Sequence, residues 1–214
     1  LSAEIYPGET VGIIGGTGSG KSTVAALIPR FYDPTQGTIY MDGIDIKQYS
    51  FEQLREQIGV VPQRAVLFTG TIESNLKWGN EHATKEQMEQ ALRIAQAEEF
   101  VSRLPKGLQT EVSQGGANFS GGQRQRLTIA RALVGQPKIL ILDDSASALD
   151  YATDAKLRMA IARETQNMTV IIVSQRANSI RNADKIIVLD QGHVMGIGTH
   201  RELLNTCPIY KEIC

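Results

Sequence analysis

The chain has 214 residues, a formal net charge of −1 and 42% hydrophobic residues. This composition is typical of a folded soluble domain, and the balanced charge gives no sign of a polyanion-binding surface. No apolar run approaches the roughly 18 residues needed to cross a bilayer, so any membrane attachment must come from another segment or chain.

The first informative stretch is the apolar run at residues 11–14 together with the glycine-rich segment behind it. The segment fits the pattern G-x-x-x-x-G-K-[ST] and consists of Gly15, Gly16, Thr17, Gly18, Ser19, Gly20, Lys21 and Ser22, followed by Thr23. Between a strand and a helix, such a loop turns consecutive backbone N–H groups toward phosphate oxygens. Lys21 is placed to meet the β- and γ-phosphates, and Ser22 to put its hydroxyl on Mg²⁺. The pattern therefore predicts a site for a nucleotide triphosphate.

Short apolar runs and capping patterns organise the rest of the chain. Runs typical of strands buried on both faces of a parallel sheet occur at residues 11–14, 58–61, 139–142, 170–173 and 186–189. Capping-box patterns, which predict helix starts, begin at Ser50, Thr84 and Thr199. The long section between the second and third runs has helical periodicity. The sequence therefore predicts an α/β core of residues 1–63 and 137–214 with an inserted helical section at residues 64–136.

The second decisive motif opens a helix inside that section. It consists of Phe119, Ser120, Gly121, Gly122 and Gln123, and an apolar-periodic stretch follows at residues 127–133. Ser120 is thereby placed as the N-cap. The sequence resembles the ATP-binding domain of ABC transporters, whose signature L-S-G-G-Q corresponds to these five residues. The resemblance covers nearly the whole chain and implies a P-loop NTPase (RecA-like) core, a mostly parallel sheet, an inserted helical subdomain, and ATP with Mg²⁺ as ligands. It also implies further strands, with an adenine-stacking residue, before Leu1.

Further positions match this family in the order that the family has them. The resemblance implies that Asp143 is the Walker B aspartate that holds Mg²⁺ and that Gln63 is the Q-loop glutamine, which also belongs to the Mg²⁺ site and senses the position of the transport domain. It further implies that Asp150 belongs to the D-loop that crosses to another subunit. Residues 67–72 resemble the segment after the exporter Q-loop, and residues 110–116 resemble the exporter X-loop. Together they narrow the resemblance to exporter-type ABC proteins.

Two residues depart from the family pattern at positions that the family uses for ATP hydrolysis. Family members that hydrolyse ATP efficiently have a glutamate after the Walker B aspartate, whereas this chain has Asp144. A base that must reach a water proton within about 2.6–3.2 Å is typically worth 10²–10⁴-fold in rate, so a carboxylate one methylene shorter predicts slow hydrolysis. The family's switch histidine is replaced by Gln175, which donates a hydrogen bond but carries no positive charge.

These departures resemble the degenerate-site subunit of heterodimeric ABC exporters. The expected partners are a second, non-identical ATP-binding domain with an intact glutamate and histidine, and the transmembrane domains of the same transporter at the cytoplasmic face of the membrane. No nucleic acid is expected as a partner. Two alternatives stay open: an active ATPase domain of a homodimeric exporter with Asp144 as base, and a soluble ABC ATPase without a transport role.

Overall fold

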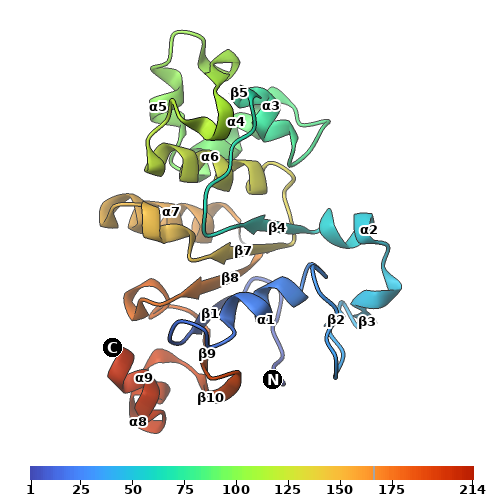
Figure 1. Cartoon of the computed structure of the whole chain (residues 1–214), viewed down its shortest axis with the longest axis vertical. Coiled ribbons are helices and arrows are strands. Elements are labelled where there is room, and N and C mark those ends of the chain that lie inside the picture. Colours follow the sequence, from blue (N-terminus) through green and yellow to red (C-terminus); the bar gives the residue numbers. More distant parts are fainter. Residues whose placement is uncertain (166) are drawn as a thin grey trace. The chain divides into compact units, whose positions relative to one another are not determined.

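The computed structural model describes residues 1–165 and 167–214, apart from the side chains of Ala146 and Ser147. Internal contacts divide the chain, whose elements are labelled in Figure 1, into two compact units. The first unit consists of Leu1–Ile58, Ile141–Asp144 and Asn167–Cys214, and the second of Gly59–Leu140 and Ser145–Gln166. The predicted bounds of the inserted section stay a prediction, because contact units need not coincide with an inserted segment.

The main sheet has the strand order β10-β9-β1-β8-β7-β4. Strand β1 runs parallel to β8 and to β9, whereas β10 runs antiparallel to β9. The bounds are β1 Thr10–Ile14, β4 Ile58–Val61, β7 Ile139–Asp143, β8 Thr169–Ser174, β9 Lys185–Asp190 and β10 His193–Gly198. All five predicted runs are confirmed as strands, and the α/β class with a mostly parallel sheet is confirmed with them.

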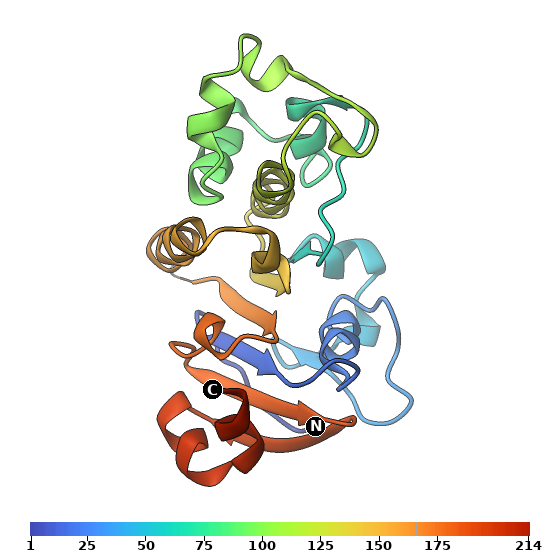
Figure 2. The same ribbon diagram turned by 60° about the vertical axis from the view of Figure 1, so that its left-hand side comes forward.

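The helices of the first unit are short and lie around this sheet. They are α1 Lys21–Leu27, α2 Phe51–Arg55, α8 His200–Thr206 and α9 Pro208–Ile213, with a hairpin of β2 Tyr40–Met41 and β3 Ile44–Asp45 and the 3₁₀ turns η1 Ile46–Gln48 and η5 Ala177–Ser179. The predicted capping boxes at Ser50 and Thr199 are confirmed at the starts of α2 and α8. In Figures 1 and 2, α8 and α9 (red) lie beside β10. They cover a cluster in which Ile14, Leu203 and Tyr210 are at most 1% exposed.

The second unit is mainly helical, as predicted for its central section. Its helices are α3 Ile72–Lys77, α4 Lys85–Ile94, α5 Glu98–Ser102, α6 Gly121–Leu133 and α7 Tyr151–Glu164, with the 3₁₀ turns η2 Gly107–Gln109, η3 Gln114–Gly116 and η4 Ser145–Ala148. Both α3 and α4 pack on α6. Among the helices of residues 1–165 and 167–214, none is long and apolar enough to cross a bilayer.

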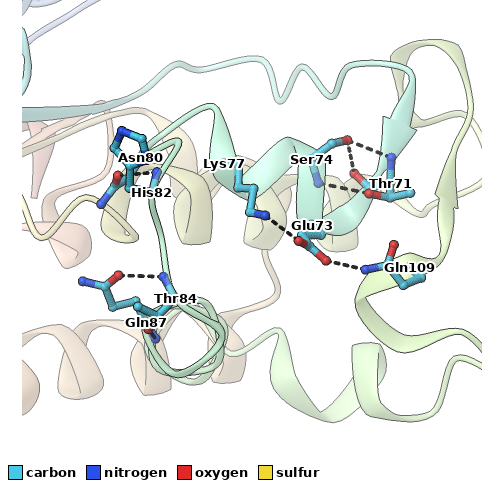
Figure 3. A network of polar contacts seen from close by, with 9 residues as sticks. All are labelled: Thr71, Glu73, Ser74, Lys77, Asn80, His82, Thr84, Gln87 and Gln109. Atoms are coloured by element: carbon cyan, nitrogen blue, oxygen red, sulfur yellow. Dashed lines mark hydrogen bonds and ion pairs between the residues drawn. The ribbon is translucent and has the colours of Figure 1, made fainter.

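Two segments that the sequence related to exporters lie side by side in the second unit. The short strands β5 Gly70–Thr71 and β6 Glu111–Val112 pair antiparallel. Beside them, the carboxylate of Glu73 pairs with the ammonium of Lys77 at 2.6 Å and also accepts a hydrogen bond from the amide of Gln109 (Figure 3). The segment that leads into α3 is therefore tied both to η2 and to the predicted X-loop.

Candidate nucleotide-binding site

The glycine-rich loop connects β1 to α1, and its backbone conformation depends on glycine. Gly18 and Gly20 have φ angles of 79° and 96°, which lie in the left-handed region that glycine adopts without strain. A Cβ on Gly15 would lie 2.0 Å from the carbonyl oxygen of Leu189, whereas a Cβ on Gly16 or Gly18 would meet nothing within 4 Å. The loop is thus packed against β9 at its start and open along the stretch that phosphate oxygens would approach.

Lys21 lies inside this loop and is only 7% exposed. Its ammonium donates hydrogen bonds to the carbonyl oxygens of Gly15 and Gly16 at 2.8 and 2.6 Å. Burial lowers the pKa of Lys21, and the nearby carboxylates of Asp144 and Asp143 act against this lowering. The Lys21 ammonium is therefore held at the loop by neutral backbone carbonyls. An anionic ligand can replace these carbonyls as its hydrogen-bond acceptors.

Two consecutive carboxylates lie at the end of β7: Asp143 is its last residue and Asp144 follows it. The hydroxyl of Ser22 donates to Oδ1 of Asp143 at 3.0 Å, so these two oxygen ligands are already adjacent. The backbone N–H of Asp144 donates to the carbonyl oxygen of Val173 at 2.9 Å, which fixes Asp144 beside β8. Asp144 also has a φ angle of 45°, a left-handed conformation that non-glycine residues rarely adopt.

The sheet register brings Gln175 to the same edge. Ile14 at the end of β1 is the register partner of Ser174 at the end of β8. The chain leaves β1 as the glycine-rich loop and leaves β8 as Gln175, so the two segments start side by side, and the Gln175 side chain is exposed. The carboxyl ends of parallel strands are where α/β sheets bind ligands. The first unit thus assembles Lys21, Ser22, Asp143, Asp144 and Gln175 around the loop.

These residues fit a magnesium nucleotide. Mg²⁺ prefers oxygen ligands and is usually bound by one or two carboxylates together with substrate phosphates. The adjacent oxygens of Ser22 and Asp143 match that donor set. No cluster of three or more histidine, cysteine, aspartate or glutamate side chains suited to a metal occurs among the described residues. Substrate phosphates usually supply the remaining oxygen ligands of Mg²⁺ in such sites.

The signature segment lies in the second unit, where it begins α6. Ser120 accepts a hydrogen bond from the N–H of Gln123 at 3.2 Å, and the Gln123 side chain accepts one from the N–H of Ser120 at 2.9 Å, so the predicted N-cap is a complete capping box. Phe119 is buried, with its ring 6.4 Å from that of Phe100. A Cβ on Gly121 would meet only the guanidinium of Arg124, at 3.9 Å, so the backbone there is open.

The two remaining predicted positions also belong to the second unit. Asp150 is the N-cap of α7 and accepts hydrogen bonds from the hydroxyl and the N–H of Thr153 at 2.6 and 2.9 Å. These bonds lower the pKa of Asp150. Gln63 is exposed and follows β4 by two residues. Both therefore present polar groups at the surface of their unit.

The residues that follow the signature in α6 had no predicted role. Arg124 donates to the carbonyl oxygen of Phe119 at 2.6 Å, and Arg126 donates to that of Gln96 at 2.8 Å while its guanidinium lies 4.8 Å from the centre of the Phe100 ring. Gln125 between them is fully buried. A polar residue on the inner face of an amphipathic helix was the signal that could have drawn attention to it.

Comparisons with known proteins agree with this arrangement. A family model described as ABC transporter matches residues 1–147. An uncharacterized ABC transporter ATP-binding protein of Mycobacterium bovis is 48% identical over 99% of the chain, and an ATP-dependent lipid A-core flippase of Chromobacterium violaceum is 42% identical over all of it. The chain spans 37% and 36% of these relatives. A solved structure of a bacterial Atm1-family ABC exporter with ATP bound matches 97% of the chain and 36% of its own, with 40% identity and a TM-score of 0.92.

Proposed function

Because the chain belongs to the ABC transporter family, we propose that it is the ATP-binding domain of an exporter whose own ATP site binds ATP–Mg²⁺ but hydrolyses it slowly. The observation that carries the proposal is the edge of the first unit, where a buried lysine, a serine–aspartate pair and two altered catalytic positions meet. The groups for binding are all present there, and the groups for hydrolysis are both weakened.

Binding follows from groups that already lie at the loop. ATP phosphates would take the open backbone N–H groups, and the ammonium of Lys21 would exchange the carbonyl oxygens of Gly15 and Gly16 for β- and γ-phosphate oxygens. Ser22 and Asp143 would hold Mg²⁺, which neutralises phosphate charge when it is bound. A charge-assisted bond to phosphate is stronger than one to a neutral carbonyl, so this exchange favours the bound state.

Slow hydrolysis follows from the two altered positions. Asp144 is held close to Val173 by its own backbone, and its carboxylate is one methylene shorter than the glutamate of efficient relatives. A water molecule that is correctly placed for a glutamate would therefore lie beyond its reach. Gln175 stands at the same edge and offers an amide, which cannot supply the positive charge that stabilises the transferring phosphoryl group.

The partner we propose is a second, non-identical ATP-binding domain. The signature of this chain is complete, and its capping box leaves Gly121 open to a ligand from outside. In a head-to-tail pair this segment would complete the partner's site, while the partner's signature would complete the site at Lys21. An intact signature beside a weakened base supports unequal sites, with the partner supplying the competent glutamate and histidine.

The transmembrane domains of the same transporter are the other proposed partner, at the cytoplasmic face of the membrane. Phe68 and Trp78 are 43% and 70% exposed with their rings 4.9 Å apart, and Val66, two residues before Phe68 in the sequence, is 47% exposed. Exposed apolar side chains that gather in one patch are typical of protein–protein contacts. The curated relatives are longer than this chain by more than its own length, which leaves room in them for such domains.

The test is to measure binding and turnover separately on the same preparation. We expect the chain to bind ATP in the presence of Mg²⁺ and to hydrolyse it barely above background, and we expect Asp144→Asn to leave that background rate unchanged. Brisk turnover by the isolated chain, abolished by Asp144→Asn, would contradict the proposal. It would favour the fully active homodimeric alternative, in which Asp144 serves as the base.

A further inference from the structure

The side chain of Gln125 is an unexplained polar group in the interior of the second unit. It is 0% exposed, and neither its amide nitrogen nor its amide oxygen has a hydrogen-bond partner among the described residues. Buried polar groups in native proteins are nearly always paired, because an unpaired one loses its bonds to water without replacement. An amide that is orphaned at both ends therefore calls for a function.

A neighbouring buried hydroxyl on the same helix is hydrogen-bonded. Thr128, which is 1% exposed, donates its hydroxyl to the carbonyl oxygen of Arg124 at 2.9 Å within α6. Leucine or methionine at position 125 would fill the space without an unpaired group and would favour the helix equally well. The glutamine is therefore a worse choice than these residues for the folded state seen here.

The position of Gln125 on α6 indicates what it faces. It lies three residues after Gly122, and residues three apart share a helix face. A Cβ on Gly122 would lie 3.5 Å from the carbonyl oxygen of Ala148, and α6 packs on η4. The face that carries Gln125 is therefore turned toward η4, whose first residue, Ser145, is 3% exposed.

Turn η4 connects the two carboxylates of the ATP site to the D-loop aspartate. It starts directly after Asp144, which has a left-handed φ angle of 45°, and it ends two residues before Asp150. Asp143 is held by the Ser22 hydroxyl, which ATP–Mg²⁺ would engage. Nucleotide would thus act on the chain immediately before η4.

We propose that Gln125 is a positioning residue whose amide hydrogen-bonds the backbone of η4 when ATP–Mg²⁺ is bound, and so fixes the segment that leads to Asp150. The inference rests on the proposed function, because it requires the nucleotide at Ser22 and Asp143. A glutamine amide both donates and accepts, so it can take one N–H and one carbonyl of a short turn. Such bonds would pair both ends of the amide, which have no partner among the described residues.

The test compares the wild-type chain with Gln125→Met and with Thr128→Val as the matched control on the same helix. Without nucleotide, we expect Gln125→Met to unfold at the same temperature as the wild type or higher, because an apolar side chain of similar size replaces unpaired groups. With ATP–Mg²⁺, we expect its affinity to fall about five- to thirtyfold, the size of one or two lost hydrogen bonds.

Hydrogen exchange distinguishes a positioning role of Gln125 from a purely structural one, because only the positioning role changes how ATP–Mg²⁺ affects the exchange rate of η4. We expect ATP–Mg²⁺ to slow exchange at the backbone amides of residues 145–150 in the wild type and in Thr128→Val, and to leave it unchanged in Gln125→Met. The control should lose stability equally with and without nucleotide.

Two results would overturn the role of Gln125. One is a Gln125→Met chain that is less stable than the wild type without nucleotide, since its amide would then already be satisfied. The other is a Gln125→Met chain that keeps both the affinity and the slowed exchange. A wild-type chain that binds no ATP–Mg²⁺ would instead contradict the proposed function, and this inference with it.

Discussion

The two glycine-rich segments of this chain both lead into a helix, but they begin it differently. Helix α1 follows Gly20, which has a φ angle of 96° and offers no side-chain cap, whereas α6 follows Ser120 with a complete capping box. The first loop spends the backbone N–H of Ser19 on the carbonyl oxygen of Gly16 at 3.2 Å and buries a lysine among its carbonyls. The second uses two of its donors internally. We therefore expect the first segment to bind a nucleotide within its own domain. We expect the second, whose conformation is already fixed by its cap, to contact the nucleotide of another domain.

The largest expected effect tests whether the site around the first loop lacks only its catalytic groups. We expect Asp144→Glu combined with Gln175→His, studied with a competent partner domain, to raise turnover at this site by about 10²–10⁴-fold, because the longer carboxylate reaches the water and the imidazole can carry charge. Steady-state phosphate release measures it. ATP affinity serves as the control and should stay unchanged; a double variant no faster than the wild type would contradict the degenerate-site proposal.

The next effect tests whether the first loop binds phosphate through Lys21. We expect Lys21→Met to weaken ATP–Mg²⁺ binding by about 10²–10⁴-fold, since each hydrogen bond to a charged group contributes about 1.5–3 kcal/mol and Lys21 would make two. Calorimetric titration checks this. Lys47→Met, at an exposed lysine of the same unit, is the matched control and should bind as the wild type does. Equal affinity of the two variants would show that the phosphates do not meet Lys21.

The sequence specified most of what the two segments share. The strand before the first loop, the Ser120 cap and the capping boxes at Thr84 and Thr199 all follow from local patterns, and the structure confirms them. Such features depend on residues within one turn of each other, which is why a single sequence contains the signal. The apolar runs likewise fixed the parallel strands, because strands buried on both faces lack alternation.

What the sequence could not specify depends on long-range packing. Strand β10 was not predicted, because alternate residues on it are exposed at the sheet edge and its apolar signal is weak. Strands β5 and β6 have two residues each, too few for any periodicity. The left-handed backbone of Asp144 and the orphaned amide of Gln125 depend on neighbours far along the chain. The first concerns the candidate nucleotide site and the second the helix that carries the signature, and at such positions local rules are the least informative.

The third prediction sharpens the comparison at the signature. We expect Ser120→Ala to lower the free energy of unfolding by about 1 kcal/mol through loss of the cap, and to slow hydrolysis at the partner's site while ATP affinity at Lys21 stays unchanged. Ser50→Ala, which removes an equivalent capping box from α2, is the matched control. It should cost similar stability and leave the partner's turnover intact. If both variants slow the partner equally, the signature has no role of its own.

The smallest effect concerns the N-cap of α7 at Asp150, whose contribution to stability should depend on pH. The hydroxyl and the N–H of Thr153 hold the pKa of Asp150 below its ordinary value. A carboxylate with a lowered folded-state pKa stabilises the fold above its unfolded pKa, and this contribution is lost as the pH falls through the folded pKa. We therefore expect Asp150→Asn, which keeps a good N-cap, to unfold like the wild type at pH 7 and to lose less stability below about pH 4.

Thermal unfolding from pH 7 to pH 3 measures the difference. Thr153→Val should show part of the same reduced loss of stability in acid, because the backbone donor remains. If the wild type and Asp150→Asn lose thermal stability equally as the pH falls, the charge of Asp150 does not stabilise the fold, and the residue acts only as a neutral N-cap of α7.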